Sequence, residues 1–154
     1  MKIQFRTAES DDVESVVQVL KRSRQEYLPY LKSPHTLEED RCWVREALIP
    51  TGRVVLADAD DVCVGVLATS IAEEIGWIDQ LYLAPGYVGR GIGTSLLMHA
   101  LGVLPRPIRL WAFQQNGRAL RFYKHHGFVA TKYTDGTDNE EKCPDVLLEL
   151  SGAE

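Results

Sequence analysis

Cysteine, long apolar runs and excess positive charge are all scarce in this chain of 154 residues. The three cysteines, Cys42, Cys63 and Cys143, are odd in number and far apart, which fits neither a disulfide framework nor a zinc site. No uncharged apolar stretch approaches the roughly 18 residues of a membrane span, and residues 1–6 contain no apolar signal region. We therefore expect a cytoplasmic protein with no metal site and no membrane association.

The overall charge also restricts the partners. The formal net charge is −5, whereas nucleic-acid binding needs a basic face, so nucleic acid is not expected as a partner. A cationic partner suits the sign better. Hydrophobic and charged contents of 45% and 25% are those of an ordinary soluble domain. Because no repeat, linker or low-complexity segment interrupts the chain, we expect one domain over residues 1–154.

The most informative stretch is a glycine-dense turn between a strand and a helix. Leu81, Tyr82 and Leu83 read as a strand that Pro85 ends, and residues 88–93 (Val-Gly-Arg-Gly-Ile-Gly) lead into an apolar helix. Glycines let the backbone approach a ligand, and a helix start offers unpaired N–H groups and a partial positive charge. The turn therefore predicts a phosphate site.

Other readings of this turn are less suitable. A dinucleotide-binding fingerprint requires a third glycine in G-x-G-x-x-G, and Ser95 and Leu96 follow Gly93 instead. A P-loop requires a lysine after the last glycine, which is absent here. The remaining alternative is a tight turn whose glycines serve packing alone.

Hydrophobic periodicity and turn residues predict the element order β-α-α-β-β-β-α-β-α-β-β. Short turns between three neighbouring strands imply an antiparallel meander, and the later strand–helix–strand segment implies a parallel crossover. The fold class is thus α/β, with a mixed sheet flanked by helices on both faces. Strands are expected near residues 3–6, 53–58, 62–72, 77–83, 108–112, 128–134 and 145–150, and helices near 10–26, 36–49, 91–103 and 117–126.

Several side chains are expected to shape the ends of these elements. Asp11 with Glu14, and Thr36 with Glu39, have the spacing of capping boxes. Gly65 is expected to mark a β-bulge in its strand.

Two motifs carry a resemblance to a known family. Val88 to Gly93 is similar to the acyl-CoA pyrophosphate loop Q/R-x-x-G-x-G/A of the GNAT family of N-acetyltransferases, with Val88 where the family has Gln or Arg. The segment from Asn116 to Phe128 resembles the family signature N-x-x-A-x-x-F-Y-x-x-x-G-F. The element order is also the order of the GNAT fold, with its central, mostly antiparallel sheet, so the resemblance spans nearly the whole chain.

This resemblance implies that an acetyl group passes from acetyl-CoA to a primary amine by direct attack in a ternary complex. The acidic loop at residues 135–145 favours a small cationic amine as acceptor. The alternative is a non-catalytic acyl-CoA sensor or interaction module on the same fold, suggested by Val88. Both a homodimer and a monomer are compatible with the sequence.

The resemblance also implies the cofactor-binding set. The backbone of the strand at residues 81–83 is expected to pair with the pantetheine arm, with plain sheet pairing as the alternative. Asn116 is expected to cap its helix and to contact the CoA arm. The complete predicted set is Leu81, Tyr82, Leu83, Val88, Gly89, Arg90, Gly91, Ile92, Gly93, Thr94, Asn116, Ala119 and Tyr123.

Two residues are the principal catalytic candidates. Tyr123 lies two helical turns after Asn116, on the same face, and a tyrosine of ordinary pKa is protonated at pH 7 and can act as general acid. An aromatic ring packed on the sheet is the alternative. Asp79 is the candidate base, because strand alternation places it beside Leu81 and Leu83; a carboxylate that hydrogen-bonds backbone is the alternative.

Other candidates border the expected acceptor side. Glu140, Glu141 and Asp145 are alternative bases, although for each one singly a solvated acidic loop is the favoured account. His35 lies in a loop there and reads as a loop residue rather than a catalyst. The aromatic residues expected to line an acceptor pocket are Tyr27, Tyr30 and Trp43, with core packing the favoured account of Trp43.

Overall fold

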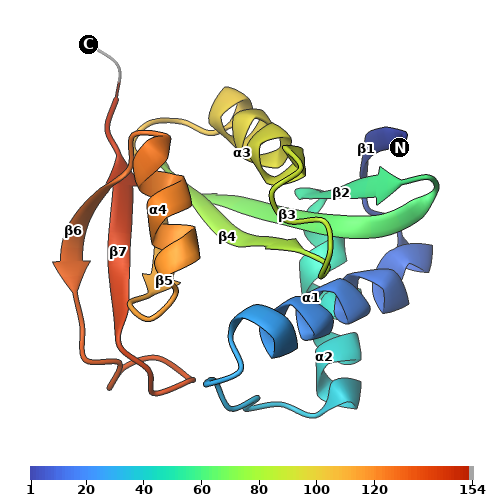
Figure 1. Cartoon of the computed structure of the whole chain (residues 1–154), viewed down its shortest axis with the longest axis horizontal. Helices are drawn as coiled ribbons and strands as arrows, with labels where there is room; N and C mark the ends of the chain where they lie inside the picture. Colours follow the sequence, from blue (N-terminus) through green and yellow to red (C-terminus); the bar gives the residue numbers. More distant parts are fainter. Residues whose placement is uncertain (153–154) are drawn as a thin grey trace.

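A computed structural model of the chain, which describes residues 1–152, confirms the mixed sheet. The seven strands lie in the order β1-β2-β3-β4-β5-β7-β6 (Figure 1), and β4–β5 is the parallel pair. The strands are β1 (Ile3–Thr7), β2 (Val54–Ala59), β3 (Val62–Ala72), β4 (Ile75–Leu83), β5 (Ile108–Phe113), β6 (Val129–Tyr133) and β7 (Asp145–Leu150). The helices are α1 (Val13–Tyr27), α2 (Leu37–Trp43), α3 (Ile92–Val103) and α4 (Gly117–His125).

The helix starts differ in part from the predictions. The Thr36–Glu39 capping box is confirmed, with Glu39 N–H donating to Thr36 Oγ1 at 3.1 Å. The box expected at Asp11 is wrong, because a 3-10 turn (Ser10–Asp12) precedes α1 and the backbone N–H of Glu9 donates to Asp12 at 2.8 Å. The second predicted helix is also shorter: α2 continues into a π-helical turn (Val44–Leu48) and a 3-10 turn (Ile49–Thr51).

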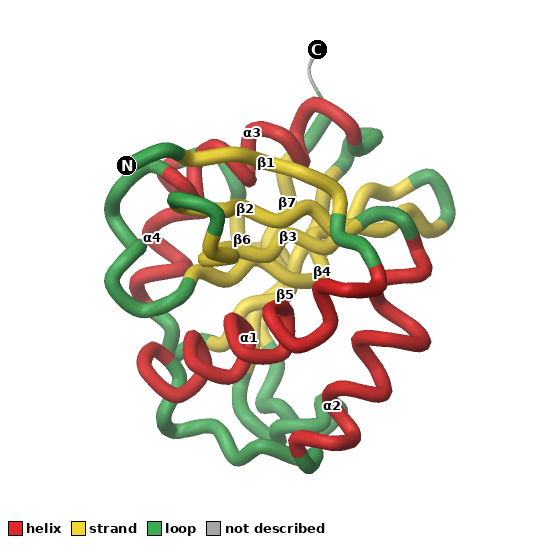
Figure 2. The backbone as a smooth tube through the Cα atoms, turned by 90° about the vertical axis from the view of Figure 1, so that its right-hand side faces the viewer, coloured by secondary structure: helices red, strands yellow, loops and turns green. Residues whose placement is uncertain are grey.

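Helices cover both faces of the sheet, and each face has its own apolar core (Figures 1 and 2). α3 and α4 pack over one core, where Leu96, Leu97 and Leu148 are fully buried. α1 and α2 cover the other core, which contains Val16 and Leu56. Each such side chain contributes roughly 1.5–3 kcal/mol through burial. None of the helices described is long and apolar enough to cross a bilayer.

The two central strands part soon after they meet. In the described residues, β4 pairs with β5 only at Gly76–Ile108 and Trp77–Arg109. Gly76 permits this junction, because a Cβ there would lie 2.7 Å from the carbonyl oxygen of Pro105. Just beyond, the β3–β4 register skips Asp79, which forms a bulge, and a bulge bends and twists a strand. The C-terminal half of β4 therefore leaves β5, and in the described residues its edge on that side has no strand partner.

The bulge expected near Gly65 is confirmed. The β2–β3 register shifts where Gly65 faces Ala57, and Val64 is the residue that it skips.

Candidate functional site

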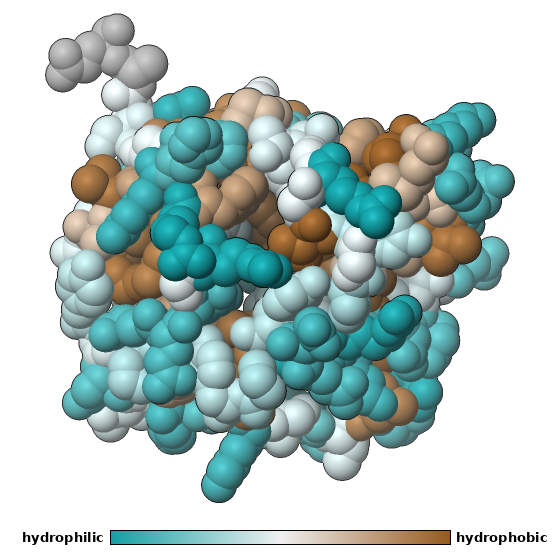
Figure 3. Space-filling view, in the orientation of Figure 1, coloured by the Kyte–Doolittle hydropathy of each residue, from teal (hydrophilic) through white to brown (hydrophobic). Residues whose placement is uncertain are grey.

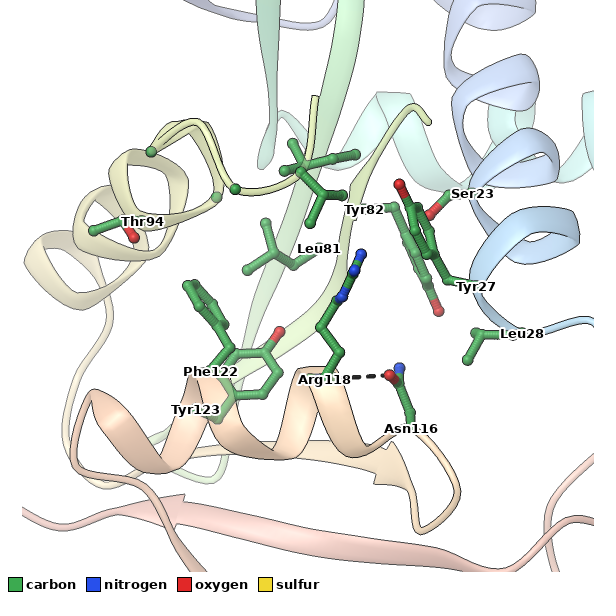
Figure 4. Close-up of a pocket in the computed structure, with 16 residues that line it drawn as sticks. Ser23, Tyr27, Leu28, Leu81, Tyr82, Thr94, Asn116, Arg118, Phe122 and Tyr123 are labelled. Atoms are coloured by element: carbon green, nitrogen blue, oxygen red, sulfur yellow. Dashed lines mark hydrogen bonds between the residues drawn. The ribbon is translucent and has the colours of Figure 1, made fainter. Parts of the chain in front are cut away.

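A cavity of about 240 Å³ lies between the C-terminal end of β4 and helix α4 (Figure 4). Its walls are β4, the glycine turn, the start of α3, one face of α4 and the end of α1. All of the predicted cofactor-binding residues line it except Arg90 and Ile92. The two sequence motifs, far apart in the chain, thus meet across one cavity.

The glycine turn has the backbone conformation of an anion-binding loop. Gly89 and Gly91 have φ values of 82° and 85°, which side chains other than glycine rarely adopt. Gly91 is the N-cap of α3, and within residues 1–152 no side chain caps this end. The first-turn N–H groups of α3 therefore lack intrahelical acceptors. Together with the helix dipole, they favour an anion at this position.

Arg90 and Ile92 contribute differently from the rest of the turn. The side chain of Ile92 is buried in the core, so only its backbone is available to a ligand. The Arg90 guanidinium lies 5.7 Å from the centre of the Tyr87 ring, outside the cavity lining. These placements do not bring either side chain to the cavity.

Val88 does line the cavity, although its side chain has no hydrogen-bonding group. We expect Val88→Gln to tighten CoA binding modestly if a side-chain contact is missing there, because the amide can donate to a phosphate oxygen. Isothermal titration of wild type and variant with CoA measures this. An unchanged or weaker affinity would mean that the backbone donors already suffice.

Tyr123 is buried, with 7% of its surface exposed, and it lines the same cavity. Its ring packs edge-on against Phe122 and Phe128, at centroid distances of 5.2 and 5.5 Å, which fixes the ring's orientation. The hydroxyl points from α4 into the cavity beneath Leu81 (Figure 4). Burial, with a smaller effect of Tyr82, raises the pKa of Tyr123 above its ordinary value, so the hydroxyl stays protonated at neutral pH.

Asn116 holds the start of the helix that carries Tyr123. Its side-chain oxygen accepts a hydrogen bond from the backbone N–H of Ala119 at 3.3 Å, which confirms the predicted N-cap. Asn116 and Ala119 also line the cavity. The cap therefore fixes the first turn of α4 against the same space that the Tyr123 hydroxyl enters.

A second, larger cavity of about 1200 Å³ lies on the α1–α2 side of β4. Among residues 1–152, Leu28 and Tyr82 alone line both cavities, so the two meet at the end of α1 and the C-terminal end of β4. Figure 3 shows this face of the molecule hollowed near its centre, with apolar atoms beside the hollow and hydrophilic side chains around it.

Carboxylates outnumber cations around the larger cavity. Two polar contacts join the segments on either side of it: His35 Nε2 lies 3.0 Å from Glu140 Oε1, and Arg24 Nη2 lies 3.4 Å from Glu141 Oε2. The loop before β7 is thereby held against α1 and the α1–α2 loop. The acidic residues of the lining are Glu39, Asp40, Glu46, Glu140 and Glu141, against Lys21 and Arg24.

Strand alternation does not place Asp79 beside Leu81 and Leu83, because the bulge interrupts the strand period at that residue. Asp79 is exposed and lines neither cavity. Partial desolvation by neighbouring protein atoms raises the pKa of the Asp79 carboxyl group, and the Ser70 hydroxyl lowers it. The role of Asp79 as general base remains a prediction, and its position outside both cavities does not favour that role.

Asp145, another candidate base, is held in the loop structure. Its side chain accepts hydrogen bonds from the Thr134 hydroxyl and, at 3.1 Å, from Asn139 Nδ2. It lines neither cavity. Asp145 thus organises the start of β7 rather than facing a substrate.

The aromatic candidates separate into three outcomes. Trp43 is 43% exposed and lines the larger cavity, so the core-packing interpretation is wrong. Tyr27 lines the smaller cavity rather than the larger one, and Tyr30 lines neither. Burial raises the pKa of Tyr30, with smaller contributions from Cys143 and Tyr82.

Sequence reasoning missed Ser23, Leu28 and Arg118, which also line the smaller cavity. The Arg118 guanidinium lies 5.0 Å from the centre of the Tyr27 ring, a cation–π contact that joins α4 to α1. Arg118 occupies a variable position of the second motif, and Ser23 and Leu28 stand outside both motifs. No local pattern marks them, because only the packing of α1 beside α4 brings them to the cavity.

Comparison with known proteins agrees with this geometry. The model of the acetyltransferase (GNAT) family matches residues 17–128, most of the chain. The chain therefore belongs to the GNAT family, and it is an acetyl-CoA-dependent N-acetyltransferase.

Individual relatives extend over nearly the full length. The chain is 28% identical to the peptidyl-lysine N-acetyltransferase YjaB of Escherichia coli, over 99% of this chain and 100% of that protein. It is 25% identical to a spermidine N(1)-acetyltransferase of Thermoplasma acidophilum, over 90% of this chain and 94% of that protein. A crystal structure of the PaiA N-acetyltransferase of Thermoplasma acidophilum with coenzyme A superposes with a TM-score of 0.78 at 24% identity, covering 99% and 100% of the two chains.

Proposed function

We propose that this enzyme transfers the acetyl group of acetyl-CoA to a small cationic amine by direct attack in a ternary complex. The observation that carries the proposal is the pair of cavities that meet at Tyr82. The smaller cavity has the glycine turn at one end and the Tyr123 hydroxyl within it, which suits an acyl-CoA thioester. The larger cavity is rich in carboxylates and suits a cation.

The placement of the smaller cavity supports a bound pantetheine arm. Beyond Trp77, the edge of β4 that faces β5 has no strand partner within the described residues. Free backbone groups on that edge are available to the amides of the arm, and one N–H there can polarise the thioester carbonyl. The phosphates then reach the start of α3.

The reaction requires two groups that transfer protons, a base for the amine and an acid for the leaving sulfur. An amine of pKa about 10.4 costs roughly 4.6 kcal/mol to present neutral at pH 7, so a base that takes one proton lowers the barrier. The neutral nitrogen attacks the thioester carbon, and the carbon–sulfur bond breaks. Tyr123 gives its hydroxyl proton to the leaving sulfur and regains one from the nitrogen of the product amide. The raised pKa of Tyr123 keeps this donor protonated.

The choice of a cationic acceptor rests on the lining of the larger cavity and on the loop before β7, where acidic residues predominate. The relatives named for spermidine and for peptidyl-lysine acetylation both modify amines that carry positive charge at neutral pH. The volume of about 1200 Å³ admits a whole small amine.

We expect diamines and polyamines to be acetylated with higher kcat/KM than neutral amines of equal length, because the cavity's carboxylates attract the extra charge. Added salt should reduce this preference. Thiol release from acetyl-CoA, with mass spectrometry of the acetylated amine, measures both effects.

Two results would contradict this assignment. Equal rates for neutral and cationic amines would remove the acidic cavity from substrate selection. Tight CoA binding without turnover on any small amine, peptide or protein lysine would favour the alternative, a non-catalytic acyl-CoA sensor.

A further inference from the structure

Glu141 is more sheltered from water than two of the other carboxylates around the larger cavity, Glu140 and Glu39. Its side chain is 15% exposed, whereas those of Glu140 and Glu39 are 64% and 60% exposed. A carboxylate this sheltered from water interacts with a bound charge more strongly than an exposed one does. Glu141 therefore interacts more strongly with an acceptor in this cavity than Glu140 or Glu39 does.

The charge of Glu141 also reaches the residue at which the two cavities meet. Both Glu141 and its partner Arg24 act electrostatically on Tyr82, the polar residue that lines both cavities. An amine beside Glu141 is thus at the junction through which it must reach the thioester. Glu46 lies on α2 and is engaged by the Cys42 thiol at 3.4 Å, and Glu39 caps α2.

The present partner of Glu141 is held loosely. One nitrogen of Arg24 approaches one carboxylate oxygen at 3.4 Å, longer than the 2.7–2.9 Å usual for charge-assisted pairs. By contrast, the Arg6 guanidinium donates two hydrogen bonds, of 2.8 and 2.9 Å, to the Asp12 carboxylate. A substrate ammonium therefore replaces Arg24 beside Glu141 at small cost.

We propose that Glu141 is the catalytic base of this enzyme, and that Arg24 is its counter-ion while the acceptor cavity is empty. The inference rests on the proposed amine acetylation. The Glu141 carboxylate takes one proton from the acceptor's ammonium group, which becomes a neutral amine and attacks the thioester carbon. The resulting carboxylic acid releases its proton to solvent after CoA leaves.

The charged and titratable groups that face Glu141 come from several elements. Arg24 on α1 pairs with Glu141, and the charge of Glu141 acts on Tyr82 of β4. Lys21, His35 and Glu140 line the same cavity. The pH dependence of kcat/KM distinguishes the loss of a base at Glu141 from a change in these neighbouring charges.

The test compares Glu141→Gln with wild type, using acetyl-CoA and a diamine from pH 6 to 9. Asp138→Asn is the control, since it removes a carboxylate from the same loop and Asp138 is exposed and lines neither cavity. At pH 7 we expect Glu141→Gln to lower kcat/KM by about 10²-fold or more, with CoA affinity and melting temperature near those of wild type. Asp138→Asn should behave as wild type.

The pH profile separates catalysis from structure. Without the base, the variant depends on amine that is already neutral, whose fraction rises about tenfold per pH unit below the amine pKa. The deficit of Glu141→Gln should therefore shrink as pH rises, whereas a merely structural defect gives a constant ratio to wild type. If the glutamine variant loses CoA affinity, Glu141→Asp, which keeps the carboxylate, should retain the wild-type pH slope at a reduced rate.

Failure of this inference is distinct from failure of the proposed function. If wild type releases no thiol with any amine, the proposed function is wrong. If wild type turns over and Glu141→Gln keeps its rate, or loses rate equally at every pH, then Glu141 is not the base.

Discussion

Replacing Tyr123 with phenylalanine should lower kcat by about 10²-fold or more, the usual contribution of a positioned acid. The ring, and with it the edge-on packing against Phe122 and Phe128, is retained, so stability and CoA affinity should hardly change. Because the loss falls on the chemical step, kcat and kcat/KM should decrease together. Steady-state kinetics with thiol detection, beside CoA titration, measures all three.

Tyr133→Phe is the matched control, since Tyr133 is 64% exposed on β6 and lines neither cavity. The raised pKa of Tyr123 adds a second expectation: wild-type activity should not fall because of Tyr123 ionisation as pH rises through the ordinary tyrosine range. A folding defect with little loss of rate would identify the Tyr123 hydroxyl as structural. The leaving sulfur would then take its proton from water.

Replacing Gly93 with valine should abolish measurable CoA binding while the protein still folds. Gly93 lines the smaller cavity within the first turn of α3, and a Cβ there would lie 3.5 Å from Leu83 and 3.8 Å from Phe122, which is ordinary contact. The two further methyl groups then occupy space that the cofactor needs. Calorimetric titration with CoA, together with a melting curve, tests both parts.

Gly102→Val is the appropriate control, because Gly102 lies in the same helix and a Cβ there meets nothing within 4 Å. Gly91→Val is a less clean test: Gly91 has a φ of 85°, so a β-branched residue strains the turn as well as blocking it. CoA affinity retained in Gly93→Val would mean that the glycine turn is only a connection between β4 and α3.

Much of the cofactor site was predictable because backbone chemistry fixes its residues. The turn needs glycine wherever φ is positive, as at Gly89 and Gly91, and α4 needs Asn116 to cap it, so both motifs leave a local pattern. The order of strands and helices along the chain followed from periodicity and short turns in the same way. These features depend on residues close together in the chain.

The features that the sequence did not predict depend on contacts between distant segments of the chain. The bulge at Asp79 arises where β4 turns away from β5, and no local pattern marked it, so strand alternation could not fix the face of Asp79. Trp43 was expected in the core because it is large and apolar, yet a cavity beside α2 leaves it 43% exposed. Arg24 and Glu141 are 117 residues apart and meet only in the folded chain.

Direct transfer between two adjoining cavities is most directly tested by intact-protein mass spectrometry after mixing the enzyme with acetyl-CoA, with and without a diamine. The account predicts that the protein mass stays unchanged in both mixtures, and that CoA is released rapidly only when the diamine is present. An acetylated protein that forms with acetyl-CoA alone, and loses its acetyl group when the diamine is added, would contradict direct transfer and indicate a covalent intermediate.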